Sequence, residues 1–86
     1  MPEIARFLGM VVAMFYNDHS PPHSHVRYGE HSAAVGIDPP ALLEGWLPPR
    51  VLGLVLEWAT LHRAALLADW ERARRLQPLL PVPPLE

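Results

Sequence analysis

The 86-residue chain contains no cysteine and no lysine. The missing cysteines exclude a disulfide framework, a cysteine-ligated zinc site and a thiol nucleophile. All seven basic residues are arginines, and with nine acidic residues they give a formal net charge of −2. This acidic balance argues against a large nucleic-acid footprint, which usually requires a basic domain.

Long hydrophobic runs are also missing. The stretch 7–16 is uncharged and mostly apolar, but a transmembrane helix needs roughly 20 such residues. Glu3 and Arg6 precede this stretch, and the polar sequence 16–19 follows it, which does not resemble a signal peptide and its cleavage site. We therefore expect a cytoplasmic protein without a membrane partner.

Proline is abundant, with 11 residues that include four Pro-Pro pairs. Each pair favours an extended or turn segment, because proline disfavours the helical region for the residue before it. Between these stops the hydrophobic pattern predicts strands at 4–16, 25–28, 31–37 and 43–47. The connections are short, which predicts an antiparallel sheet.

A helical segment is predicted over 49–76, because Pro48-Pro49 suits a first helical turn and no proline interrupts the sequence until Pro78. Its length suggests a bend or break near 62–65. The proline-rich tail 78–86 is expected to be extended and to lie on the body or on a partner. The whole predicts one α+β domain over 1–86, with three to four antiparallel strands and the C-terminal helical segment packed on one face.

A chain of this size buries only about 60% of the surface of its unfolded form, so its core is thin. A thin core and a long apolar helix favour a homodimer or a complex with a small partner protein.

A histidine loop at 17–25 carries the candidate chemistry. Four of the five histidines lie between positions 19 and 31, and His23 and His25 share one face of an extended backbone. Together with His19 and Asp18 they can hold a divalent metal, for which we expect zinc or manganese.

Two other interpretations of the loop stay open. In the first, His23 or His25 is a general acid or base, Asp18 orients an imidazole, and Arg27 contacts a phosphate. In the second, the loop is purely structural or contacts a partner, since Asn, Asp, Ser and Pro are ordinary turn residues.

The loop also resembles a family. The sequence Asn17-Asp18-His19-x-Pro21-Pro22-His23-x-His25 is similar to the hallmark of the prokaryotic domain of unknown function DUF4160. Further similar segments are Met1–Ile4, Tyr28–Glu30, Glu44–Pro48, Leu54–Arg63 and Trp70-Glu71. Ser24 departs from the family, whose members usually carry an aromatic residue there.

The resemblance implies a small bacterial protein that often occurs beside a second small protein of unknown function, in an arrangement like a toxin–antitoxin pair. We therefore expect a component of such a module, with the loop as its working site. Whether it is an enzyme stays open, and so does RNA as a partner; catalysis would most naturally be phosphodiester chemistry on RNA. The alternative is a non-enzymatic regulatory module that binds a partner protein encoded nearby through the tail and Trp46.

Overall fold

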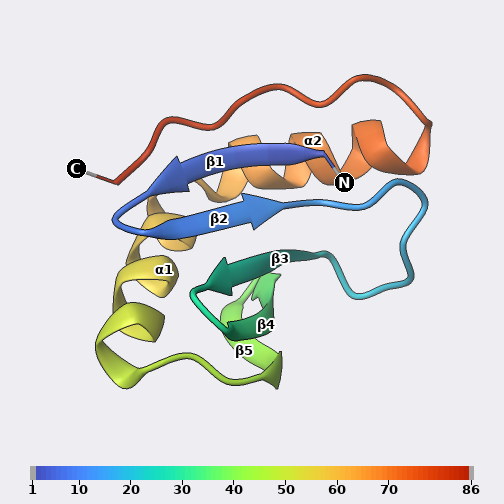
Figure 1. Ribbon diagram of the computed structural model, residues 1–86. Helices are drawn as coiled ribbons and strands as arrows, with labels where there is room; N and C mark the ends of the chain where they lie inside the picture. Colours follow the sequence, from blue (N-terminus) through green and yellow to red (C-terminus); the bar gives the residue numbers. More distant parts are fainter. Residues whose placement is uncertain (1, 86) are drawn as a thin grey trace.

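The computed structural model describes residues 2–85 and contains a five-stranded antiparallel sheet followed by two helices (Figure 1). The strands follow one another across the sheet in chain order, β1-β2-β3-β4-β5. Two-residue turns at 8–9, 29–30 and 38–39 join three of the pairs, whereas the longer segment 14–22 joins β2 to β3. The elements are β1 (Glu3–Phe7), β2 (Met10–Ala13), β3 (His23–Tyr28), β4 (His31–Ile37), β5 (Pro40–Gly45), α1 (Pro49–Leu61) and α2 (Arg63–Arg74). The predicted α+β class and antiparallel sheet are confirmed.

The prediction of one long strand over 4–16 is wrong, because the chain turns at Leu8 and Gly9 to make the β1–β2 hairpin. Both turn residues have positive φ angles, 49° and 82°, as two-residue hairpin turns require. A side chain at position 9 would also lie 3.1 Å from the ring of Tyr28. Because Leu8 is apolar, the turn does not interrupt the hydrophobic pattern, and the sequence therefore did not predict it. With this hairpin the sheet has five strands rather than the predicted three or four.

The other strand boundaries shift by a few residues. The strand predicted at 25–28 begins at His23, and the one predicted at 43–47 spans Pro40–Gly45. Gly45 ends β5 with a φ of 85°, and a Cβ there would collide with the carbonyl of Ser32. Only glycine therefore allows the chain to leave the sheet at this point and continue to Trp46.

The predicted helical segment is two helices that meet at His62 with a bend of 83°. Pro49 opens α1, where its missing N–H costs no helical hydrogen bond. Within residues 2–85, neither helix alone has the length and hydropathy to cross a membrane, although the bent pair together meets those two criteria.

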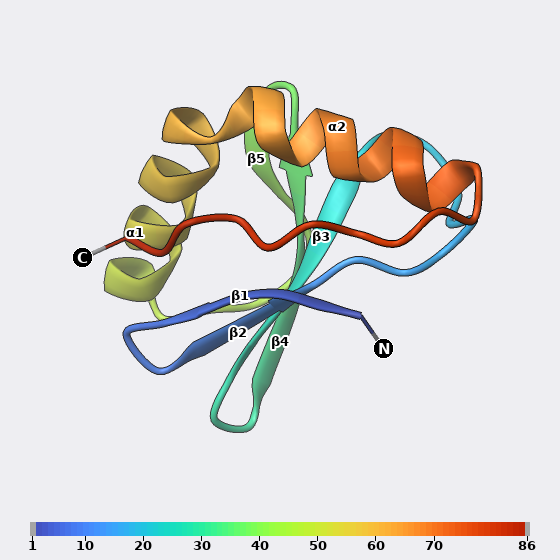
Figure 2. The same cartoon turned by 90° about the horizontal axis from the view of Figure 1, so that it is seen from above.

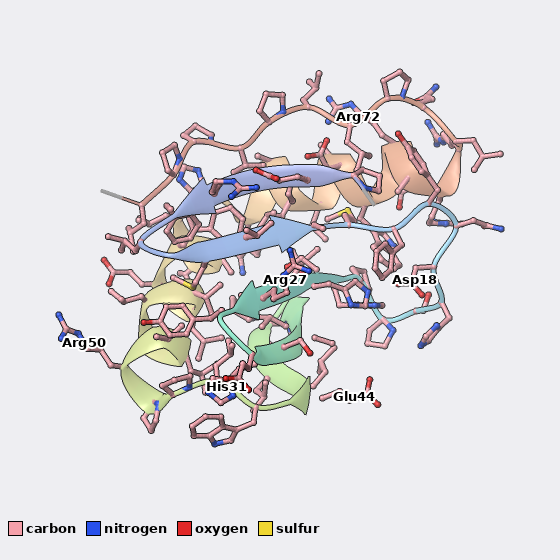
Figure 3. The ribbon with its side chains drawn as sticks, viewed as in Figure 1. Asp18, Arg27, His31, Glu44, Arg50 and Arg72 are labelled. Carbon is pink, nitrogen blue, oxygen red and sulfur yellow. The ribbon has the colours of Figure 1, made fainter. Side chains whose placement is uncertain are left out.

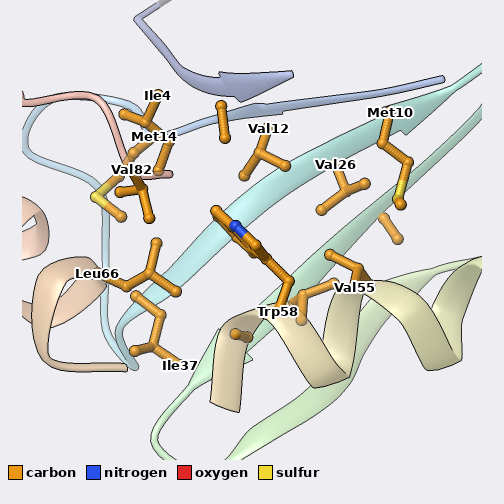
Figure 4. Close-up of a cluster of buried hydrophobic side chains, with 14 of the residues drawn as sticks. Ile4, Met10, Val12, Met14, Val26, Ile37, Val55, Trp58, Leu66 and Val82 are labelled. Carbon is orange, nitrogen blue, oxygen red and sulfur yellow. The ribbon is translucent and has the colours of Figure 1, made fainter. Parts of the chain in front are cut away.

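The core lies between the helices and one face of the sheet (Figure 4). Val12 and Val26 project from the sheet toward Trp58 of α1, whose side chain is fully buried, and Val35 of β4 belongs to the same core. Trp58 also packs on the ring of Phe7, with a centroid separation of 5.1 Å. This layer of large side chains holds the helices against the sheet.

The tail is extended and packs on the body, running between the helices and β1 (Figure 2). The Val82 N–H donates to the carbonyl of Ile4, and the indole N–H of Trp58 donates to the carbonyl of Pro83, both at 2.8 Å. Val82 is itself buried in the core. The tail is thus a structural part of the domain. Deleting it would disturb the core, so a deletion alone does not test whether the tail binds a partner.

Candidate functional site

The histidine loop connects β2 to β3 and is attached to the body at both ends. The N–H of Asn17 donates to the carbonyl of Ala73 near the end of α2, and the N–H of Ile37 donates to the carbonyl of Pro22, both at 3.1 Å. The ring of His23 packs on Trp70 of α2, 5.2 Å between centroids. These contacts hold the loop over one end of the sheet.

Asp18 of the loop converges with His23 and His25, which lie at the start of β3. The Nε2 atoms of both imidazoles lie 3.0 Å from the same carboxylate oxygen, Oδ2 of Asp18. One potential ligand atom from each of the three residues lies within 4.8 Å of the other two. The cluster is largely buried, since His23 is 4% exposed and the side chain of Asp18 is 14% exposed.

The proton of His23 has a defined place. Its Nδ1 lies 2.7 Å from the carbonyl oxygen of Pro21, which can only accept a hydrogen bond, so Nδ1–H is the donor. In the neutral ring Nε2 is then an unprotonated lone pair, and it faces a carboxylate oxygen. Two acceptors at 3.0 Å repel each other unless a cation or a proton lies between them.

Asp18 is ionised at neutral pH. Burial acts to raise its pKa, but the hydrogen bond from His25, the backbone N–H of His19 and the charges of nearby imidazoles outweigh it and lower the pKa to about 2. The cluster therefore contains a stable anion with two imidazole nitrogens directed at it.

Of the four expected metal ligands, His19 is not in the group whose ligand atoms lie within 4.8 Å of one another. Its Nδ1 is 3.0 Å from the other carboxylate oxygen of Asp18, but its side chain is 88% exposed. His31 is remote from the loop and packs edge-on against Trp46. The candidate centre therefore consists of Asp18, His23 and His25.

The outer face of the sheet, opposite the helices, continues from this cluster (Figure 3). His25 and Arg27 alternate with the buried Val26 along β3, and His25 pairs with Ala34 of β4, which pairs with Glu44 of β5. Shallow clefts adjoin His25 on two sides. A cleft of about 160 Å³ lies toward Leu43 and Glu44, and a cleft of about 310 Å³ lies toward Phe15 and Arg27.

The sequence interpretation missed Phe15, Ala34 and Glu44. Phe15 packs on the ring of His25 with a centroid distance of 4.2 Å, and Ala34 and Glu44 line the smaller cleft. One sequence pattern, in β4, could have predicted this part of the outer face. In β4 the small residues Ser32, Ala34 and Gly36 alternate with the core residues, which leaves a face without bulk.

Comparison with protein families gives a match. Residues 9–71 match the sequence profile of a domain of unknown function (DUF4160). No curated protein and no solved structure matches the chain.

Proposed function

The chain belongs to the DUF4160 family, and we propose that this member binds a divalent transition metal through Asp18, His23 and His25. The observation that supports the proposal is the orientation of His23. Its Nδ1–H is committed to the Pro21 carbonyl, so Nε2 is the ring nitrogen that faces the Asp18 carboxylate. A hydrogen bond from Nδ1–H to a carbonyl is the usual way a protein directs Nε2 of a histidine toward a metal.

The donor set and its spacing fit such an ion. Two imidazoles and a carboxylate suit zinc, manganese or iron. One ligand atom from each of the three residues lies within 4.8 Å of the other two, which is close enough for small side-chain movements to place all three around one ion. Three protein ligands leave positions open for water or substrate, as in catalytic rather than structural sites.

General acid–base chemistry by His23 fits the geometry less well. Both ring nitrogens of His23 already have partners, and the residue is 4% exposed. A catalytic imidazole needs one nitrogen within reach of the substrate. His25 is the better candidate for contact with a substrate, since its side chain is 32% exposed and it adjoins both clefts.

Metal analysis tests the proposal. Protein prepared without a histidine tag should contain near-stoichiometric metal or take up zinc or manganese in a calorimetric titration. His23→Ala and His25→Ala should lose this binding, whereas His31→Ala, a matched control away from the loop, should retain it. His19→Ala should have a much smaller effect, because His19 is exposed and lies outside the cluster.

Absence of metal binding would contradict the proposal. If the protein binds neither metal at neutral pH, Asp18, His23 and His25 form a hydrogen-bonded cluster that does not bind metal. The metal proposal then fails.

The biological role proposed for this centre is that of a toxin–antitoxin-like module in the cytoplasm, and it rests on the family resemblance. If the centre acts on RNA, expression should arrest growth, and His25→Ala should relieve the arrest. Expression without growth arrest or RNA decay would contradict that role and leave metal binding unaffected.

A second candidate function, binding of a partner protein, is favoured by β5. This strand is the last of the sheet, so within residues 2–85 one of its edges has no partner strand. Leu43 is 47% exposed and Trp46 is 54% exposed beside it. An exposed edge of this kind can accept a strand from another chain.

Trp46 gives the sharper test of partner binding, because deleting the tail would remove Val82 from the core. Trp46→Ser should abolish co-purification with the partner encoded nearby. Leu76→Ser, which alters another exposed apolar residue at the end of α2, should leave it intact. Equal recovery of the partner with both variants would contradict a role for β5.

A further inference from the structure

The larger cleft on the outer face places an arginine beside the candidate metal centre. It has a volume of about 310 Å³ and is lined by Val11, Phe15, His25, Val26, Arg27 and Ser32. Arg27 stands two residues from His25 on the same face of β3, a spacing of roughly 6.6–6.8 Å along a strand. A guanidinium and a candidate metal ligand therefore border one cleft.

Arg27 has no ion pair within residues 2–85. By contrast, Arg6, Arg63, Arg72 and Arg74 each contact a carboxylate. Arg50 and Arg75 also lack such a contact within residues 2–85, but Arg50 borders a different cleft, beside Tyr28 and Val51, and Arg75 follows the last residue of α2. Arg27 thus combines a free guanidinium with access to the space next to His25.

We propose that this cleft binds a phosphate group that bridges the metal and Arg27, an inference that rests on the proposed metal centre. Arg27 and the Ser32 hydroxyl, which line the cleft, would contact the phosphate oxygens, and a metal ion held by His25 would supply a further positive charge. Arginine presents paired N–H donors that match phosphate oxygens.

Charge favours phosphate over carboxylate. A divalent ion and Arg27 together would carry three positive charges, and the carboxylate of Asp18, as a ligand of the ion, would cancel one of them. The remaining excess of two matches a phosphate dianion, whereas a carboxylate would neutralise only half of it.

The same charges favour a small phosphate-bearing molecule over a nucleic acid. The chain has a net charge of −2, and Glu44 lies across Ala34 from His25. Among residues 2–85, the outer face therefore has no row of cations that could follow a phosphate backbone. Affinity for polynucleotides depends on several such contacts.

The test measures phosphate binding to zinc-loaded protein by calorimetry, with metal content determined in the same samples. We expect saturable binding of inorganic phosphate at one site, and weaker binding of acetate. Arg27→Gln should reduce phosphate affinity by about 10–100-fold, as expected when a hydrogen bond to a charged group is lost, while zinc affinity stays unchanged. Arg27→Lys should restore part of the loss, and Arg50→Gln should behave like the parent protein.

The possible negative results distinguish the phosphate proposal from the metal proposal. If zinc binds but phosphate does not, or if Arg27→Gln binds phosphate as the parent does, the cleft proposal is overturned and the metal centre stands. If zinc does not bind, both are overturned. A ten-nucleotide single-stranded RNA that binds much more tightly than phosphate would overturn the assignment to a small ligand.

Discussion

The two faces of the sheet differ in almost every property. The inner face presents large apolar side chains such as Val12, Val26 and Val35, and two helices and the tail cover it. The outer face presents His25, Arg27, Ser32 and Ala34, and it is hollowed by clefts. Because neighbouring residues of a strand point to opposite faces, one strand can serve stability with one set of positions and chemistry with the other. Substitutions should therefore separate the two faces.

The largest effect is expected on the inner face, at Trp58. Trp58→Ala should lower the free energy of unfolding by about 3–5 kcal/mol, because it leaves a cavity and removes the hydrogen bond to Pro83. Urea unfolding followed by circular dichroism measures this. Trp58→Phe should cost less, since the ring still fills most of the space. An unchanged urea midpoint in Trp58→Ala would contradict the central position of this residue.

Asp69, buried where α2 meets the tail, should have the next largest effect. Its Oδ1 accepts hydrogen bonds from the N–H of Leu80 and from Arg72, both at 2.9 Å. Asp69→Ala should destabilise the protein by about 2–3 kcal/mol and speed hydrogen exchange at the Leu80 amide. Asp69→Asn keeps an acceptor oxygen and should do less harm. Unchanged exchange at Leu80 in both variants would argue against this attachment of the tail.

A smaller effect is expected where the two faces meet, at Asp18. In the metal-free protein its pKa is about 2, against an ordinary value of 3.8, so ionised Asp18 stabilises the fold above the ordinary pKa. That stability, about 1–2 kcal/mol, should be lost as the pH falls from about 4 to about 2. Urea unfolding across this range measures it. Asp18→Asn should flatten the dependence, whereas Asp38→Asn, at an exposed carboxylate, should not. Parallel pH profiles for Asp18→Asn and the parent protein would refute the expectation.

The smallest effect on stability is expected on the outer face. Ser32→Ala should change the free energy of unfolding by less than about 0.5 kcal/mol, because the side chain is exposed and borders a cleft. The same variant should bind phosphate a few-fold more weakly if the hydroxyl contacts it. A stability loss comparable to that of Trp58→Ala would mean that the two faces are not separable.

Local patterns predicted the elements whose boundaries are marked by prolines and glycines. The strand expected at 31–37 is β4, and the helical segment expected from Pro49 breaks at His62 as its length suggested. The β1–β2 turn was missed because Leu8 keeps the pattern apolar where the chain reverses. The outer-face residues were missed because strand order and register decide which positions adjoin His25, and one strand's pattern contains neither.

The sequence by itself determined which groups are available for chemistry: no thiol, one short loop with Asp18, His19, His23 and His25, and Arg27 two residues further along β3. Only the tertiary structure decided how these groups are used. Contacts with Ala73, Ile37 and Trp70, all distant in the chain, position the loop so that His23 and His25 face Asp18 while His19 stays exposed. The physical reason is that side-chain chemistry is a property of single residues, whereas the direction of a lone pair depends on packing between segments far apart in sequence.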